Sequence, residues 1–465
     1  MGNLIHNLLP EILIIISSFL VLFNSLFNTK KIKEVNIYIS SAGIILALTF
    51  LFMQAGTISF MNNSLINSEY TKSIKILILI SSFISLCFIN FGKNELINKF
   101  SGEYTFLILI SITGSLLLVS AREFFTLIIS LELLSIPIYL ITAMGGNPKV
   151  AIEGATKLFF FGTVSTVLII FSAVLYFAGT GTTLINFSEL DSTDLISMLS
   201  LFFFFLSICF KSGLIPMHFW LSDTYQSAPS NLLPYLSTVP KIAVISMLIG
   251  LINYNSFFES FSSMKNIIFI FSACSIIYGS ILTLKQNNLF RLLAYSGIPH
   301  AGMMVIFSII NIELSYSFIF IYFCFYIFSN LALYMTLSFI TNNQYSFLAD
   351  NLKGLYKDSP YISIILIVSI LSLAGVPLTA GFWGKFNLII LTYASYGAFY
   401  TSFILIGAAI GFYYYLRIIK LILSDKNINS LNKIDISIQN KILLGFCILI
   451  IIIIGLNPNL ISYLI

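Results

Sequence analysis

Charge is what this sequence has least of. Only 9% of its 465 residues are Asp, Glu, Lys or Arg, whereas soluble globular domains carry about 25%. The five cysteines stand singly in apolar runs without CxxC spacing, which argues against a disulfide framework or a cysteine-based metal site. The sequence also contains no glycine-rich nucleotide-binding loop and no haem-type ligand pattern. An ordinary soluble globular protein is therefore excluded.

Hydrophobic residues make up 58% of the chain and fall into long runs. A membrane-spanning helix needs about 20 apolar residues. The first run has no basic segment before it and no small-residue cleavage site after it, so we interpret it as a retained helix and not as a signal peptide. The runs predict an all-α, polytopic membrane protein with 14 transmembrane helices, near residues 8–27, 37–56, 73–91, 105–120, 122–144, 150–179, 196–219, 231–253, 265–284, 290–310, 313–340, 360–394, 398–422 and 440–463.

The 23 Lys and Arg residues predict the orientation in the membrane. Fifteen of them lie in loops that follow odd-numbered helices. The four in loops after even-numbered helices are Lys72, Lys75, Arg122 and Lys265. Because basic residues concentrate on the cytoplasmic side, both termini are expected outside. The net charge of +5 thus reflects topology and is no indication of nucleic-acid binding.

One carboxylate and four lysines lie along the interior of the predicted membrane spans, where charge is costly and is functional by default. They are Glu132, Lys157, Lys211, Lys241 and Lys385. Burial disfavours the charged form of a lysine and a nearby carboxylate favours it, so such groups can take up and release protons as their neighbours' charges change. One acid does not make a sodium site, and no metal site is expected. The set therefore favours a proton relay, although Glu132 is also consistent with a protonated carboxyl bonded to a neighbouring helix.

Two further observations leave alternatives open. Glu153 precedes Lys157 by four residues, the spacing of an ion pair along one helix, so Lys157 is equally consistent with a lysine that extends to the membrane surface. His300 lies beside Pro299 in an otherwise uncharged span. A histidine there is either a hydrogen-bonded structural group or a proton carrier.

The predicted helices 4–8 and 9–13 form two comparable blocks. The fourth helix of each is long, carries one lysine and is interrupted, at Gly213–Pro216 and at Gly375–Pro377. This pattern predicts two inverted five-helix repeats with sites near the membrane midplane. The predicted parts are 1–100, 101–255, 256–425 and 426–465, namely three flanking helices, the two repeats and a last helix. The flanking helices, with Glu11 near a membrane face, are expected to pack without taking part in chemistry.

Five segments carry a resemblance to a known family. They are LELLSIPIYLI (131–141), PMHFWLSDTYQSAP (216–229), LSTVPK (236–241), FRLLAYSGIPHAG (290–302) and LSLAGVPLTAGFWGKF (371–386). They resemble the antiporter-like subunits of respiratory complex I, most of all its subunit N. Asp223-Thr224-Tyr225 follows the subunit N pattern, since the related subunits L and M and the Mrp antiporters have a histidine shortly after the aspartate. Gln226, the run Ser230–Leu233 and SGIPH (296–300) depart from the family's usual residues.

The resemblance implies a proton relay of Glu132, Lys157, Lys211, Lys241, Lys385 and His300. Glu132 and Lys211 would form the switching pair, Lys241 the central carrier, Lys157 an entry-side helper and Lys385 the carrier to a second half-channel. It also implies that NAD, FMN, iron–sulfur clusters and quinone are bound by partner subunits, with none in this chain. The implied partners are other membrane-arm subunits, including subunits M, K and J.

The sequence therefore predicts a proton-translocating membrane subunit of an NADH–quinone oxidoreductase, in a bacterial inner membrane, with an organellar inner membrane as the alternative. Two other functions stay open. One is an Mrp-type cation/proton antiporter subunit, and the other is a scaffold without a role in transport.

Overall fold

The computed structural model of the chain describes residues 2–26, 32–54, 56–91, 100–145, 147–187, 190, 194–254, 262–310, 316–341, 346–425 and 436–463. Within these ranges, 13 helices are long and apolar enough to cross a membrane. The predicted span 360–394 consists of two shorter helices, α16 (Pro360–Ala374) and α17 (Ala380–Tyr396). The prediction of an all-α polytopic membrane protein is confirmed, while the inverted-repeat relation stays a prediction.

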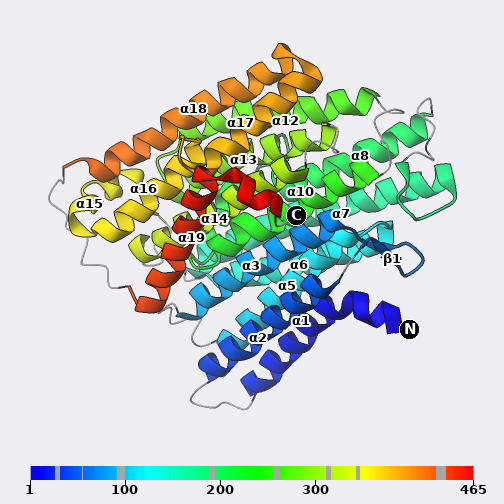
Figure 1. The fold of residues 1–465 in the computed structure, drawn as a ribbon, viewed down its shortest axis with the longest axis horizontal. Coiled ribbons are helices and arrows are strands. Elements are labelled where there is room, and N and C mark those ends of the chain that lie inside the picture. Colours follow the sequence, from blue (N-terminus) through cyan, green and yellow to red (C-terminus); the bar gives the residue numbers. More distant parts are fainter. Residues whose placement is uncertain are drawn as a thin grey trace. The chain divides into compact units, whose positions relative to one another are not determined.

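The chain divides into two compact units, and Figure 1 shows their helices. Unit 1 comprises Met1–Ser212 and Val239–Ile268, and unit 2 comprises Gly213–Thr238 and Phe269–Ile465. The predicted boundary between the repeats, at residue 255, lies outside the described residues. The predicted parts 1–100, 101–255, 256–425 and 426–465 follow the proposed repeats and differ from the two compact units. This division stays a prediction.

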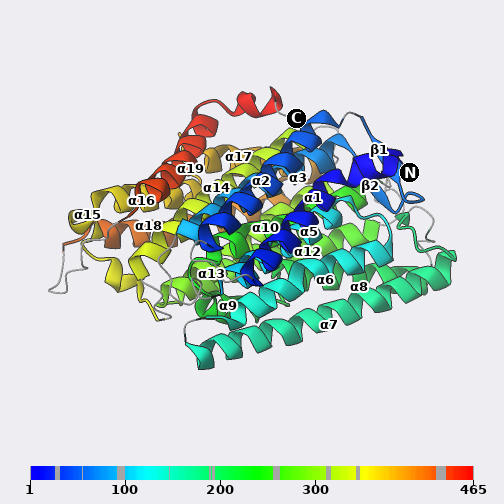
Figure 2. The same ribbon diagram turned by 90° about the horizontal axis from the view of Figure 1, so that it is seen from below.

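Unit 1 is built from the N-terminal helices. Their bounds are α1 (Gly2–Leu26), α2 (Ile32–Met53), α3 (Glu69–Phe91), α5 (Ser101–Ser120), α6 (Phe124–Ala143), α7 (Pro148–Thr180), α8 (Leu195–Ser212) and most of α10 (Leu233–Tyr254). Helix α5 packs against α1, α3 and α6, and α7 packs against α6 and α8, as Figure 2 shows for α7 and α8. A short antiparallel hairpin, β1 (Ile58–Phe60) and β2 (Leu65–Asn67), precedes α3.

Unit 2 is organised around α14 (Tyr316–Thr341), a helix whose residues are almost all buried inside the protein. It packs against α16, α17 and α19 (Ile438–Leu456). The other elements are α9 (Leu221–Ser227), α12 (Ser262–Leu284, from Phe269 on), α13 (Leu289–Ile306), α15 (Leu355–Asp358), α18 (Ala398–Leu423) and short 3₁₀ turns at Phe307–Ile309, Ala349–Leu352 and Pro458–Tyr463. The last span was expected to reach residue 463, but its α-helix ends at Leu456.

Both interruptions coincide with glycines in the left-handed backbone region, which favours glycine because it has no Cβ. Helix α8 ends at Ser212, and Gly213 has φ of 74°. Helix α16 ends at Ala374, and Gly375 has φ of 86°. In unit 2 the backbone N–H of Ile215 donates to Ser275 Oγ at 3.0 Å. This bond satisfies a backbone group that the interruption leaves without a helical partner.

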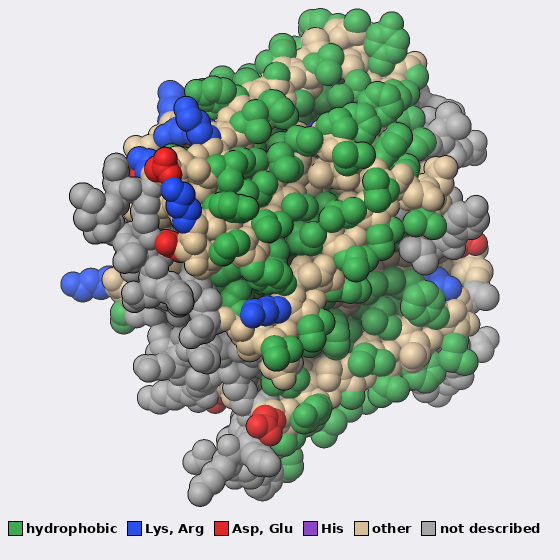
Figure 3. All heavy atoms as spheres, turned by 60° about the vertical axis from the view of Figure 1, so that its left-hand side comes forward, with side chains coloured by type: hydrophobic (Ala, Val, Ile, Leu, Met, Phe, Trp, Pro, Cys, Tyr) green, Lys and Arg blue, Asp and Glu red, His purple; other side chains and the backbone are tan. Residues whose placement is uncertain are grey.

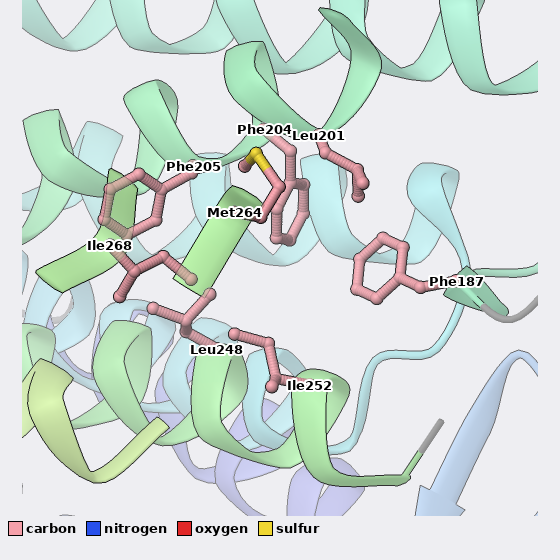
Figure 4. A pocket seen from close by; sticks show the side chains of 8 residues that line it. All are labelled: Phe187, Leu201, Phe204, Phe205, Leu248, Ile252, Met264 and Ile268. Atoms are coloured by element: carbon pink, nitrogen blue, oxygen red, sulfur yellow. The ribbon is translucent and has the colours of Figure 1, made fainter. Parts of the chain in front are cut away.

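The described surface fits a lipid environment. Hydrophobic side chains cover most of it in the view of Figure 3, and charged side chains are few. Unit 1 also contains a small apolar pocket between α8, α10 and the start of α12 (Figure 4). Its lining is Phe187, Leu201, Phe204, Phe205, Leu248, Ile252, Met264 and Ile268. None of these side chains is ionisable, so the pocket offers no chemistry to a proton relay.

Candidate proton-transfer site

Glu132 and Lys211 meet inside unit 1. Lys211 stands at the last turn of α8, one residue before its end, and its Nζ lies 3.6 Å from Glu132 Oε1 on α6. Lys211 is 8% exposed and Glu132 is 27% exposed. The helix interruption after Ser212 thus lies beside an ion pair of two groups that the sequence alone does not place together.

Further polar groups from α6 and α7 surround this pair. Lys211 Nζ donates to Ser135 Oγ at 3.0 Å and to Tyr139 Oη at 3.3 Å. Glu132, Ser135 and Tyr139 share one face of α6 because they are spaced by three and four residues. From α7, the hydroxyl of Thr166 donates to Glu132 Oε1 at 2.5 Å. Both charges therefore have polar neighbours, as buried charges require.

Lys241 lies on α10, directly after Pro240. Lys241 is 5% exposed, and its neighbours on α10 include the apolar residues Ile242 and Val244, which are 0% and 1% exposed. A proline within a helix removes one backbone donor and loosens the ladder locally. The position combines a buried amine with a local weakness of the helix, as the sequence indicates.

Lys385 lies in unit 2, on α17, and is 7% exposed. Its Nζ donates to the carbonyl oxygens of Leu373 at 2.7 Å and Ala374 at 3.0 Å. These are the last carbonyls of α16, which carry the partial negative charge of a helix C-terminus. A Cβ on Gly375 would lie 2.9 Å from Lys385 Cδ, so the glycine also makes room for the lysine.

His300 is 2% exposed on α13. Its Nδ1 is 3.1 Å from the Tyr322 hydroxyl, and its Nε2 is 3.5 Å from the Tyr415 hydroxyl. Pro299 leaves α13 continuous from Leu289 to Ile306. The two tyrosine contacts support the interpretation of His300 as a hydrogen-bonded structural group. They are also compatible with a proton carrier, because hydroxyl groups conduct protons.

Lys157 is on α7, where it pairs with Glu153 at 2.7 Å. The side chains are 40% and 66% exposed. The i,i+4 pair predicted from the sequence is confirmed. Thr166, which contacts Glu132, is nine residues further along α7, about 13 Å at 1.5 Å per residue. The structure thus places Lys157 in a partly exposed ion pair with Glu153.

The expectation that Lys75 lies in a loop is wrong, because Lys75 stands in α3 and forms a buried ion pair with Glu11 of α1. Lys75 Nζ lies 2.6 Å from Glu11 Oε1, and the two side chains are 1% and 2% exposed. That Glu11 lies near a membrane face stays a prediction. Both residues fall within long apolar helices, Asn7–Leu26 and Glu69–Ile89. Spacing along the chain could not reveal this pair because the partners are 64 residues apart. The one available signal was Lys75 itself, a lysine seven residues into a helix that begins at Glu69.

The Asp-Thr-Tyr segment has a structural role in unit 2. Asp223 on α9 forms an ion pair with Arg291 at the start of α13. The Tyr225 ring lies 5.9 Å from that of Tyr334 on α14. These contacts fix the short helix that follows the first interruption.

Among the described residues, no group of three or more His, Cys, Asp or Glu side chains could hold a metal ion.

Comparison with known proteins relates this arrangement to membrane subunits. Residues 121–411 match the family described as NADH:quinone oxidoreductase/Mrp antiporter, TM. NADH-quinone oxidoreductase subunit N 2 of Thermodesulfovibrio yellowstonii is 33% identical over 97% of this chain and 98% of its own length. NADH-quinone oxidoreductase subunit N of Ruthia magnifica is 30% identical over 97% of this chain and 95% of its own.

Solved structures show the same fold. A chain of respiratory complex I from Thermus thermophilus has a TM-score of 0.84 and 22% identity, over 97% of this chain and 98% of that chain. A chain of the Mrp complex from a Dietzia species has a TM-score of 0.78 and 12% identity, over 97% and 93%. At these identities the likeness concerns the fold.

Proposed function

Since the chain belongs to the NADH:quinone oxidoreductase/Mrp antiporter membrane family, we propose that it works as a proton-translocating membrane subunit, subunit N, of an NADH–quinone oxidoreductase. The relatives from Thermodesulfovibrio yellowstonii and Ruthia magnifica, which match over nearly their whole length, are both named as subunit N of that enzyme. The enzyme activity belongs to the assembled complex, in which this chain acts as a translocase.

The observation that carries the proposal is the Glu132–Lys211 pair beside the end of α8. When the pair is closed, the carboxylate stabilises the charged lysine. When the two groups separate, the lysine loses that stabilisation and its charge acts on other buried amines in the unit. Ser135 and Tyr139 offer Lys211 alternative acceptors, so its amine can shift without losing every hydrogen bond.

Four further residues complete the proposed relay. Lys241 is the central carrier, since it is buried on α10 of the same unit. Lys385 and His300 act within unit 2, where the α16 carbonyls and two tyrosine hydroxyls hold them. Lys157 is proposed only as an entry-side helper, because its exposure equally supports a plain surface pair.

The energy is proposed to come from quinone reduction in partner subunits. NAD, FMN, iron–sulfur clusters and quinone would be bound there, with no redox centre in this chain. The long apolar helices and the family support a multi-pass membrane protein that assembles with other membrane subunits. Subunits M, K and J as partners and the bacterial inner membrane as location are part of the proposal.

Lys241→Ala tests the function in the assembled complex. NADH oxidation and proton uptake into inverted membrane vesicles would be measured together, with Lys420→Ala on the exposed surface of α18 as the matched control. We expect Lys241→Ala to lose most proton uptake or activity and the control to keep both. Unchanged pumping in Lys241→Ala would favour a scaffold. Salt-dependent pH changes in vesicles that contain this chain alone would favour an Mrp-type antiporter.

A further inference from the structure

The buried Glu11–Lys75 pair joins two helices of the N-terminal flank. Glu11 is on α1 and Lys75 on α3, both in unit 1. Lys75 Nζ is 2.6 Å from Glu11 Oε1 and 2.8 Å from Asn67 Oδ1 on β2. Glu11 Oε2 is buried and has no hydrogen-bond partner among the described residues. Glu11 Oε1 thus accepts a hydrogen bond from Lys75, whereas Glu11 Oε2 accepts none from the described residues.

Stability does not account for this arrangement. Removing two charges from water costs several kcal/mol per ion, and well-packed apolar residues in place of a buried ion pair are often equally stable or more so. Ionisable groups within transmembrane helices are for this reason functional candidates by default. The pair is more deeply buried than Lys211 and Glu132. The Lys75 and Glu11 side chains are 1% and 2% exposed, whereas those of Lys211 and Glu132 are 8% and 27% exposed.

A chain of polar groups leads from the pair toward the β1–β2 end of α3. Asn67 Oδ1 also accepts from Ser120 Oγ at 3.0 Å, and Asn67 Nδ2 donates to the Asn7 carbonyl at 3.3 Å. Gln54 Nε2 donates to the same carbonyl, and the half-buried Lys72 donates to the Gln54 carbonyl at 2.5 Å. The distribution of basic residues assigns this end of α3 to the outer side.

Helix α3 also reaches the helix that carries Lys241. The hydroxyl of Tyr70, 8% exposed, donates to the Ser246 carbonyl of α10 at 3.1 Å. Ser246 follows Lys241 by five residues, about 7.5 Å along the helix axis. A Cβ on Gly250, one turn further, would lie 3.4 Å from both Tyr70 and the Arg122 guanidinium. Polar side chains of Tyr70 and Arg122 therefore contact α10 at Ser246 and Gly250, on the same helix as Lys241.

The charged and titratable groups near this end of α3 are few. Among the described residues they include, besides Glu11 and Lys75, Glu69, Tyr70, Lys72, Arg122 and the half-buried Glu123. Glu69 is exposed and Lys72 is half-buried, so Glu11 is the buried carboxyl at this end of the described part of unit 1.

We propose that Glu11 and Lys75 form a second proton-holding site in unit 1, which exchanges protons with the outer aqueous phase along the Asn67 side of the pair. In the holding step a proton binds Glu11 Oε2, while Oε1 keeps its hydrogen bond to the Lys75 ammonium. An O–H bond forms and the net charge of the pair changes from 0 to +1. In the release step that bond breaks, the proton leaves toward the outer side, and the ion pair is restored. The role of the site in pumping rests on the function proposed above.

The test uses the assembled complex in inverted vesicles. Glu11→Leu/Lys75→Leu replaces the pair by apolar residues of similar volume, so assembly is expected to persist. Proton uptake per NADH oxidised should fall severalfold in this double variant. The matched control, Glu69→Gln, alters an exposed acid on the same helix and should pump as the parent does. A double variant that assembles and pumps like the parent would overturn the proposal.

Infrared difference spectra give a readout that a merely structural pair would not change. A carboxyl C=O band should appear when the vesicles are acidified, vanish in Glu11→Gln and shift in Glu11→Asp. A set of carboxyl bands identical in parent, Glu11→Gln and Glu11→Asp refutes the site even if the double variant does not assemble. Lys241→Ala separates the two proposals: if it loses pumping while the Glu11 variants do not, only the second site fails.

Discussion

Lys211 and Lys385 each stand beside an interrupted helix, yet they neutralise their charge in different ways. Lys211 precedes its interruption and faces a carboxylate, Glu132, on another helix of unit 1. Lys385 follows its interruption and binds the last two carbonyls of α16. The first lysine therefore has a full counter-charge, and the second has the partial charge of a helix end, equivalent to about half an elementary charge.

This difference indicates distinct roles for Lys211 and Lys385. A carboxylate can gain or lose a proton, so the Glu132–Lys211 pair can switch between charge states. Backbone carbonyls cannot titrate, so they hold Lys385 with a constant field. We infer that unit 1 contains the switching element and that Lys385 is a carrier whose surroundings stay fixed.

The largest effect is expected from removing the titratable counter-charge. Glu132→Gln keeps the size and an acceptor for Thr166 but abolishes the charge. The rate of NADH-driven proton uptake should fall about tenfold, the factor that a loss of about 1.4 kcal/mol of transition-state stabilisation produces. The measurement is vesicle acidification with simultaneous NADH oxidation. Glu123→Gln, at the N-cap of the same helix, is the control. Full pumping in Glu132→Gln would show that the pair does not switch.

An intermediate effect is expected at Lys385. Lys385→Met leaves the Leu373 and Ala374 carbonyls without their lysine donor, and an unsatisfied buried acceptor costs about 1–3 kcal/mol. The thermal unfolding temperature of the purified complex should fall, together with pumping. Lys385→Arg keeps a charged donor and should recover most of the stability. If Lys385→Met unfolds at the same temperature as the parent, the hydrogen bonds from Lys385 to the end of α16 do not contribute to stability.

The smallest effect is expected at Lys157. An exposed ion pair contributes about 0.2–1 kcal/mol, so Lys157→Ala should lower pumping by less than about fivefold, the factor that corresponds to 1 kcal/mol. Glu153→Ala should behave in the same way, because it removes the same pair. A loss as large as that of Glu132→Gln would place Lys157 within the relay despite its exposure.

The sequence already indicates much of the fold. Apolar runs locate most spans closely, as for the run 150–179, found as α7 (Pro148–Thr180). The predicted spans 196–219 and 440–463 are each seven residues too long at their ends, since α8 ends at Ser212 and α19 at Leu456. Gly213 and Gly375 mark the two places where helices end, because a glycine followed by a proline two or three residues later does not continue a helix. The hairpin of β1 and β2 was not predicted, since its strands have only three residues each.

The sequence by itself indicated Glu132, Lys211, Lys241 and Lys385 as buried or half-buried ionisable residues, and the i,i+4 ion pair Glu153–Lys157, which helical spacing dictates. Only the tertiary structure decided that Lys211 meets Glu132, that Lys385 binds the end of α16, and that Glu11 meets Lys75. The physical reason is that spacing fixes which side chains share a face of one helix, whereas partners on different helices depend on how those helices are rotated and packed against each other.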